Sequence, residues 1–170
     1  MFGIQLNQSP TAVKLNLVEV YSGGLNSADQ NTNAPSQIYA WDGAGLVADQ
    51  GLTLNSNTTF TATQSGVFQV AAAIEVSNGE SLERSVFLMN IIHLNNQGHA
   101  KQIYSFGSAY IRTSSFFDKA ASGGSLIMNL LPSEGIQVTS RLLYAHTASG
   151  INSADASLSR CIIHRLDVGG

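Results

Sequence analysis

Residues 66–76 read GVFQVAAAIEV, and one set of alternate positions, from Phe68 to Val76, is wholly apolar. The other set contains the polar residues Gln69 and Glu75. Successive side chains of a β-strand point to opposite faces of its sheet, so this period of two predicts a strand with one buried face.

Stretches with the same period recur along the chain, and clusters rich in Gly and Asn separate them. No stretch has a 3.6-residue apolar period with capping residues at its ends. About ten short strands with turn signals roughly every 8–12 residues predict an all-β, antiparallel sandwich. The predicted strands are residues 13–21, 38–41, 58–62, 66–76, 84–94, 99–105, 107–117, 125–131, 136–145 and 158–166, and predicted turns include 95–98, 122–124 and 132–135.

The length of 170 residues suits one domain with its own core. We assign residues 13–168 to this single domain and residues 1–12 to an N-terminal arm or a frayed terminus. Residues 22–36 are rich in Ser, Asn and Gly and are expected to form an exposed loop. No run of ~18 apolar residues is present, so we expect no membrane partner. The N-terminus does not have the pattern of a secretory signal, so an extracellular protein would require cleavage of a leader not shown here.

Charged residues make up 11% of the chain, whereas a typical globular domain contains ~25%. The formal net charge is -3 and no basic cluster is present, so we expect no nucleic-acid partner. Neutral hydroxyl and amide side chains must therefore supply the polar surface. Cys161 is the only cysteine, which excludes an intrachain disulfide and predicts a small buried apolar residue.

Residues 60–70 (FTATQSGVFQV) resemble the signature of the jelly-roll superfamily that contains tumour necrosis factor and the globular heads of the first complement component. In that family an aromatic-Thr-Ala strand leads through a tight turn to a Gly, an apolar residue and an aromatic residue. Gly66, Phe68 and Val70 match this pattern. The resemblance implies a jelly-roll sandwich of ten strands that assembles as a tight homotrimer.

Later segments support the same resemblance over residues 13–168. Residues 124–138 are similar to the family's paired strands joined by an acidic-Gly turn, and residues 156–164 resemble its last strand. The chain also departs from the family, because it has no collagen-like Gly-X-Y repeat, and Ile136 replaces an acidic residue. The receptor and calcium sites of the family are therefore not transferred to this chain.

A subunit interface is also expected from the residues themselves. Residues 84–94 are largely apolar at both sets of alternate positions, which is unusual for a strand with one face in water. Phe116 and Phe117 are adjacent, so a strand would direct one ring to each face. Either a loop or another subunit must cover the second face of residues 84–94, and the two features together favour a subunit interface. The predicted interface residues are Phe87, Met89, Ile91, Tyr110, Phe116 and Tyr144.

Groups that could carry chemistry are few. His93 and His99 flank a predicted hairpin turn, but no further metal ligand lies in that hairpin, and a surface pair is the better interpretation. Cys161 and His164 are three residues apart and would project from opposite faces of a strand. The WDGAG sequence at 41–45 favours a turn over a phosphate loop. With no Gly-x-Ser-x-Gly elbow either, we expect no enzymatic activity, no metal site and no cofactor.

Two function classes fit an uncharged trimeric jelly roll. The first is a non-enzymatic structural protein of a virus particle: a bacteriophage head-decoration or cement protein, or a minor capsid or fibre component. Such a protein would be made in the host cytoplasm and would bind and stabilise the capsid surface, with the major capsid protein or another virion protein as its partner. The alternative is a trimeric carbohydrate- or receptor-binding module, in which Tyr39, Trp41 or Tyr110 could bind sugars.

Overall fold

The computed structural model describes residues 15–26, 30–31, 37–78, 84–112, 119–145, 152–154 and 158–168. These ranges are almost entirely β-structure, with one 3-10 helix (η1) and no α-helix. They contain no helix with the length and hydropathy of a membrane span. The elements are β1 (Leu15–Gly24), β2 (Gln30–Asn31), β3 (Gln37–Ile38), η1 (Gly43–Gly45), β4 (Leu52–Asn55), β5 (Thr59–Ala62), β6 (Gly66–Asn78), β7 (Arg84–Leu94), β8 (Ala100–Arg112), β9 (Lys119–Leu130), β10 (Gly135–Ala145), β11 (Asn152–Ala154) and β12 (Arg160–Val168).

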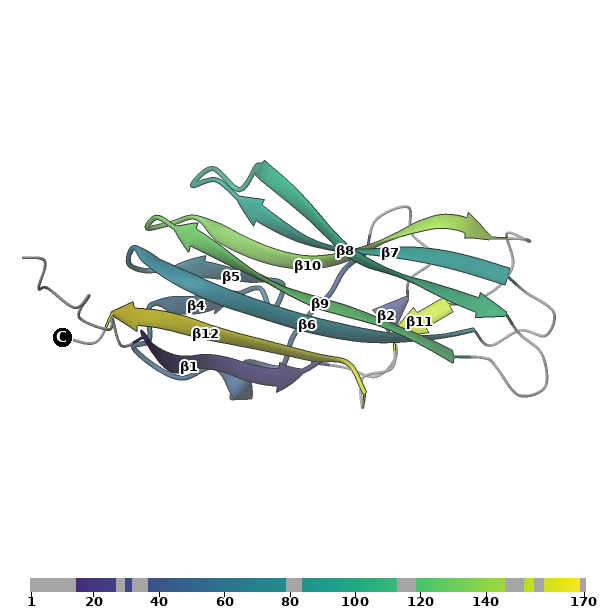
Figure 1. Cartoon of the computed structure of the whole chain (residues 1–170), viewed down its shortest axis with the longest axis horizontal. Helices are drawn as coiled ribbons and strands as arrows, with labels where there is room; N and C mark the ends of the chain where they lie inside the picture. The colour runs from purple at the N-terminus through teal and green to yellow at the C-terminus, as the bar shows by residue number, and fades with distance from the viewer. Residues whose placement is uncertain are drawn as a thin grey trace, which may run out of the picture.

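The strands form two antiparallel sheets packed face to face (Figure 1). The first sheet has β12 between β1 and β6, and β9 on the other edge of β6. The short β11 also pairs with β6, and β2 pairs with β11. The second sheet has the order β4-β5-β10-β7-β8, with β3 beside β10. Most neighbours are far apart in sequence, as in a jelly roll. The predicted all-β jelly-roll sandwich is confirmed.

The hydrophobic core fills the space between the two sheets. In β6, Phe68, Val70 and Ile74 are fully buried, whereas Ala73 on the alternate face is exposed. The period of two therefore placed this strand correctly. Aromatic residues supply much of the buried volume, and each fully buried large apolar side chain contributes about 1.5–3 kcal/mol. The largest fully buried side chains are Trp41, Tyr21, Tyr39, Phe60, Phe68, Phe87, Ile74, Met89, Ile91, Ile111, Leu130 and Ile136.

Some predicted boundaries are wrong. Residues 99–105 and 107–117 were expected as two strands, but β8 is continuous through residue 112, and residues 113–117 lie outside the described ranges. Met89 pairs with Gly107 and Asn90 with Ser105, so the residue between them is accommodated as a bulge that keeps the strand intact.

The loop predicted over residues 22–36 is also partly wrong. Its first three residues continue β1, and residues 30–31 form the short strand β2 beside β11. Residues 27–29 and 32–36 lie outside the described ranges, as does the predicted arm of residues 1–12.

The turn predicted at 122–124 is instead part of β9, and close backbone packing explains its glycines. A Cβ atom added to Gly124 would lie 2.9 Å from Cβ of Phe106, and one added to Gly123 would lie 2.8 Å from the carbonyl oxygen of Ala72. These glycines let β9 approach both β6 and β8, where the edges of the two sheets meet.

Replacing Gly123 by Val is expected to destabilise the fold by about 2 kcal/mol or more, because the obstructing Ala72 carbonyl belongs to the backbone of β6. Urea unfolding measures this change. The control is Asn129→Val, an exposed position on the same strand, where a change below about 0.5 kcal/mol is expected. Equal stability of the two variants would contradict the close approach of β9.

Candidate subunit interface

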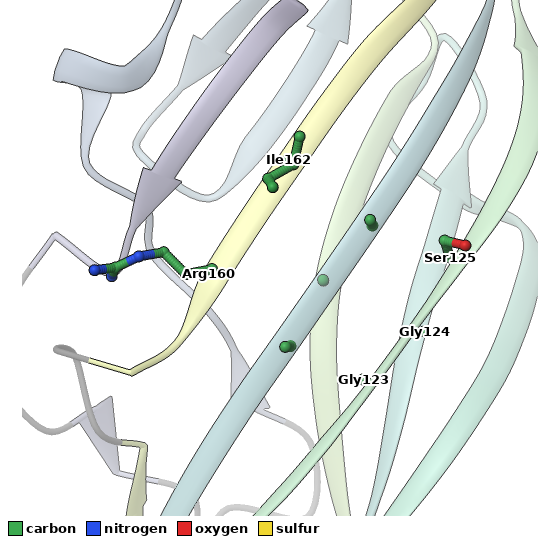
Figure 2. Close-up of a pocket in the computed structure, with 8 residues that line it drawn as sticks. Gly123, Gly124, Ser125, Arg160 and Ile162 are labelled. Carbon is green, nitrogen blue, oxygen red and sulfur yellow. The ribbon is translucent and has the colours of Figure 1, made fainter.

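A hollow of about 320 Å³ lies on the outer face of the first sheet, and we call it the groove. Figure 2 shows its centre on β6, with β12 on one side and β9 on the other. In the backbone register, Ala71 of β6 lies between Ile162 and Ser125, and Ala73 lies between Arg160 and Gly123. The lining residues are Ala71, Ala72, Ala73, Gly123, Gly124, Ser125, Arg160 and Ile162.

Small side chains create the groove. The outward positions at its centre carry the methyl groups of Ala71 and Ala73, and β9 contributes Gly123 and a serine. A sheet face in contact with water normally carries longer polar or charged side chains. Only Arg160 is charged among the lining residues, and its guanidinium donates a hydrogen bond of 3.1 Å to the backbone carbonyl oxygen of Ser159.

Large apolar side chains lie around the groove on the same face. Ile127 of β9 is 63% exposed, Val67 of β6 is 39% exposed and Ile162 of β12 is 37% exposed. On the edge strand β1, Leu17 is 57% exposed. A hollow surrounded by accessible apolar side chains is the kind of surface through which proteins associate.

Three of the predicted interface residues are misplaced. Phe87, Met89 and Ile91 are fully buried within the core of the single chain, so they have no surface left for another subunit. Strand β7 is an interior strand of the second sheet, between β10 and β8, and its inward row faces the first sheet. The assignment of these three residues to a subunit interface is therefore wrong.

The other predicted interface residues have different outcomes. Tyr110 is 53% exposed on β8, in the sheet opposite the groove. Tyr144 lies in β10, where the register pairs it with Val86 of β7. Phe116 lies outside the described residues. An interface role for Tyr110, Tyr144 and Phe116 stays a prediction.

Two aromatic residues considered for sugar binding are inaccessible. Tyr39 and Trp41 are both fully buried, and the Tyr39 hydroxyl donates a hydrogen bond of 2.7 Å to Oγ of Ser140. Burial raises the pKa of Tyr39 to about 12 despite that hydrogen bond. The prediction that Tyr39 or Trp41 could bind a sugar is therefore wrong, because neither ring is accessible. Of the three candidates, only Tyr110 has an exposed ring.

His93 and His99 were predicted to form a surface pair. This prediction is wrong for His93, because that residue is only 5% exposed. Its Nε2 lies 3.0 Å from Oε2 of Glu134, a carboxylate that also accepts hydrogen bonds from Nζ of Lys101 at 2.8 Å and from the backbone N–H of Leu131 at 2.9 Å. Burial opposes ionisation of Glu134, but these three partners outweigh it and lower its pKa to about 2. We call these residues the Glu134 cluster.

The Glu134 cluster joins two turns. Lys101 and His93 belong to the β7–β8 hairpin, and Glu134 closes the turn between β9 and β10. Both members of the His93–Glu134 pair have side chains about 7% exposed, which leaves little room for a substrate. Nowhere in the described part of the chain do three or more His, Cys, Asp or Glu side chains gather as metal ligands.

Two smaller predictions about reactive residues are confirmed. The segment at 41–45 is a turn, because the Asp42 carboxylate caps η1 by accepting a hydrogen bond of 3.0 Å from the backbone N–H of Ala44. Cys161 is fully buried and faces the core, and burial raises the pKa of its thiol. Neither feature provides a phosphate site or a reactive nucleophile.

No family model matches the chain, and no curated protein matches it in sequence. Solved structures do match its fold. Eiger TNF from S. frugiperda aligns with a TM-score of 0.50 and 13% identity, over 91% of this chain and 95% of that chain. Murine APRIL at pH 5.0 aligns with a TM-score of 0.53 and 9% identity, over 86% of this chain and 98% of that chain. The structure of murine APRIL at pH 8.5 aligns with a TM-score of 0.53 and 10% identity, over 89% of this chain and 99% of that chain. The chain is thus similar in fold, though not detectably in sequence, to jelly-roll proteins of the tumour necrosis factor type.

Proposed function

We propose that the chain forms a homotrimer through the groove and acts as a non-enzymatic binding and assembly head. The groove is the observation that carries this proposal, because it leaves a small, almost uncharged, apolar surface on a sheet face that would otherwise meet water. The jelly-roll resemblance, which implies a tight trimer, and the similarity in fold to Eiger TNF and APRIL support the same conclusion.

The size of this face suits a stable interface. Four strands about 4.8 Å apart, with a length of about 40 Å, give an area of roughly 700 Å². A specific protein–protein interface of standard size buries ~800 Å² on each partner. The outer face of the first sheet can therefore account for most of one subunit's contact with its neighbour.

The proposal also includes a surface to which the assembled trimer binds. We place the trimer on the surface of a virus particle, as a head-decoration or cement protein made in the host cytoplasm, because the low charge suits packing against other neutral surfaces. The support for this placement comes from composition. A sugar-binding head is the weaker candidate, since Tyr39 and Trp41 are buried.

Sedimentation velocity of the purified chain in dilute solution is expected to give three times the subunit mass of 18.0 kDa. A stable monomer would overturn the trimer. Co-sedimentation with preformed capsids and binding to a glycan array then address the partner, with capsid association expected. Saturable glycan binding without capsid association would overturn the placement on a virion.

A further inference from the structure

The outer face of the second sheet carries a second apolar surface, on the opposite side of the sandwich from the groove. Its central row, Val86, Leu88 and Ile92, is half-buried on β7. The neighbouring strand β8 contributes Ile103, which is 58% exposed, and Tyr110, which is 53% exposed. On the other side, β10 contributes Leu143, which is 51% exposed.

These side chains are adjacent in the backbone register. Ile92 pairs with Ile103, Val86 pairs with Tyr110, and between these two positions Leu88 pairs with Arg141 of β10. The row on β7 is apolar at Val86, Leu88 and Ile92 and is interrupted by Asn90, whose side-chain oxygen accepts a hydrogen bond of 2.8 Å from Oγ of Ser105 on β8. We call this surface the β7 face: Val86, Leu88, Ile92, Ile103, Tyr110, Arg141 and Leu143.

The charged residues within the three strands of the β7 face are all basic. Strands β7, β8 and β10 contain no Asp or Glu, yet they hold four of the chain's eight Lys and Arg residues in a protein whose net charge is -3. Those residues are Arg84, Lys101, Arg112 and Arg141, and the register pairs Arg84 directly with Arg112. Of the four, Lys101 is neutralised by Glu134.

Among the described residues, Arg141 has no such partner. It is exposed, and within the described ranges no hydrogen bond or ion pair engages its guanidinium. Two cations of the first sheet do have carboxylate partners: Lys119 lies 3.4 Å from a carboxylate oxygen of Glu75, and Arg165 lies 2.8 Å from one of Asp167. A third, Arg160, donates a hydrogen bond to the backbone carbonyl oxygen of Ser159. The β7 face therefore offers positive charge beside apolar surface, and the anion that would complement it is not supplied by these strands.

We propose that the β7 face is a docking surface for an extended acidic segment of a partner protein, with alternating carboxylate and apolar side chains. The apolar side chains would cover the β7 row, and carboxylates would pair with Arg141. A flat lipid surface fits less well, because the half-buried row on β7 lies between more exposed side chains of β8 and β10. This role is separate from the proposed trimer, which would use the groove on the first sheet.

The test uses synthetic peptides of about 12 residues, long enough to span β7 when extended. One peptide alternates Glu with Leu or Tyr, and the matched peptide has Gln in place of every Glu. Isothermal titration with the full chain is expected to show about tenfold tighter binding of the Glu peptide, with the advantage reduced by added salt. Equal binding of both peptides, or binding of neither, would overturn the proposal.

Variants locate the site. Arg141→Glu and Tyr110→Ser are each expected to weaken binding of the Glu peptide about tenfold, and Asn96→Glu, in the exposed β7–β8 turn, controls for the charge change. Both site variants should keep the sedimentation behaviour of the parent protein. A failure of the docking proposal can therefore be distinguished from a failure of the proposed trimer. Unchanged affinity in both variants, or binding to phosphatidylserine vesicles without peptide preference, would overturn the assignment.

Discussion

Ser125→Glu is expected to dissociate the proposed trimer into monomers at micromolar concentration. Ser125 is exposed in the single chain and lines the groove, so a glutamate there is solvated in the monomer. In the assembly the same carboxylate would be buried among Ala71, Ile162 and the neighbouring subunit, and the charged lining residue Arg160 lies on β12, two strands away from Ser125. Leaving a charge buried and unpaired costs about 3 kcal/mol or more, which raises a dissociation constant at least about a hundredfold.

Sedimentation velocity at several concentrations measures the effect. The matched control is Asn96→Glu, which adds the same charge at an exposed position in the β7–β8 turn and should leave the trimer intact. Urea unfolding of Ser125→Glu should remain cooperative, so loss of assembly is separable from loss of fold. A trimer that survives the glutamate would place the subunit interface elsewhere.

Glu134→Gln is expected to destabilise the fold by about 2 kcal/mol near neutral pH. The amide keeps the size of the side chain but removes the charge that His93 and Lys101 face. Lys101 is half-exposed, and solvent screening therefore reduces what its ion pair contributes. The nearly buried His93 and the N–H of Leu131 then depend on one neutral oxygen, which accounts for most of the expected loss.

The pH dependence distinguishes this charge effect from a packing effect. The pKa of Glu134 is about 2 in the folded protein and 4.5 for an ordinary glutamate, so the folded state holds this proton less tightly than the unfolded chain does. The stabilisation is therefore complete above about pH 4.5 and is lost as the pH falls toward 2. The difference in unfolding free energy between parent and variant should narrow over that range.

Urea unfolding at about pH 3 and about pH 6 gives both values. Glu75→Gln is the matched control, because its partner Lys119 is half-exposed and the pair is expected to contribute less than about 1 kcal/mol. A stability difference for Glu134→Gln that does not change with pH would mean that the carboxylate acts only by filling space.

Local patterns in the chain were enough for the fold class and for many turns. Alternation at Phe68, Val70 and Ile74 reports a half-buried strand because the side-chain period of a strand is a local property. The turns at 95–98 and 132–135 were predicted correctly, since Gly, Asn and Pro disfavour continued strand pairing. The turn predicted at Gly123 and Gly124 was wrong, because glycine is found both in turns and where two backbones approach closely.

The composition and periodicity of the chain by themselves determined an all-β sandwich, its principal strands and its scarcity of charge. Only the tertiary structure decided which face of each strand is covered. Phe87 and Met89 lie in the core because the first sheet covers them, while Ala71 and Gly123 lie on an open face. The Glu134 cluster also needed β10 to pair with β7, which joins residues about 40 positions apart. The physical reason is that a period of two specifies two faces for a strand, but long-range pairing alone assigns one of them to the core and the other to a partner.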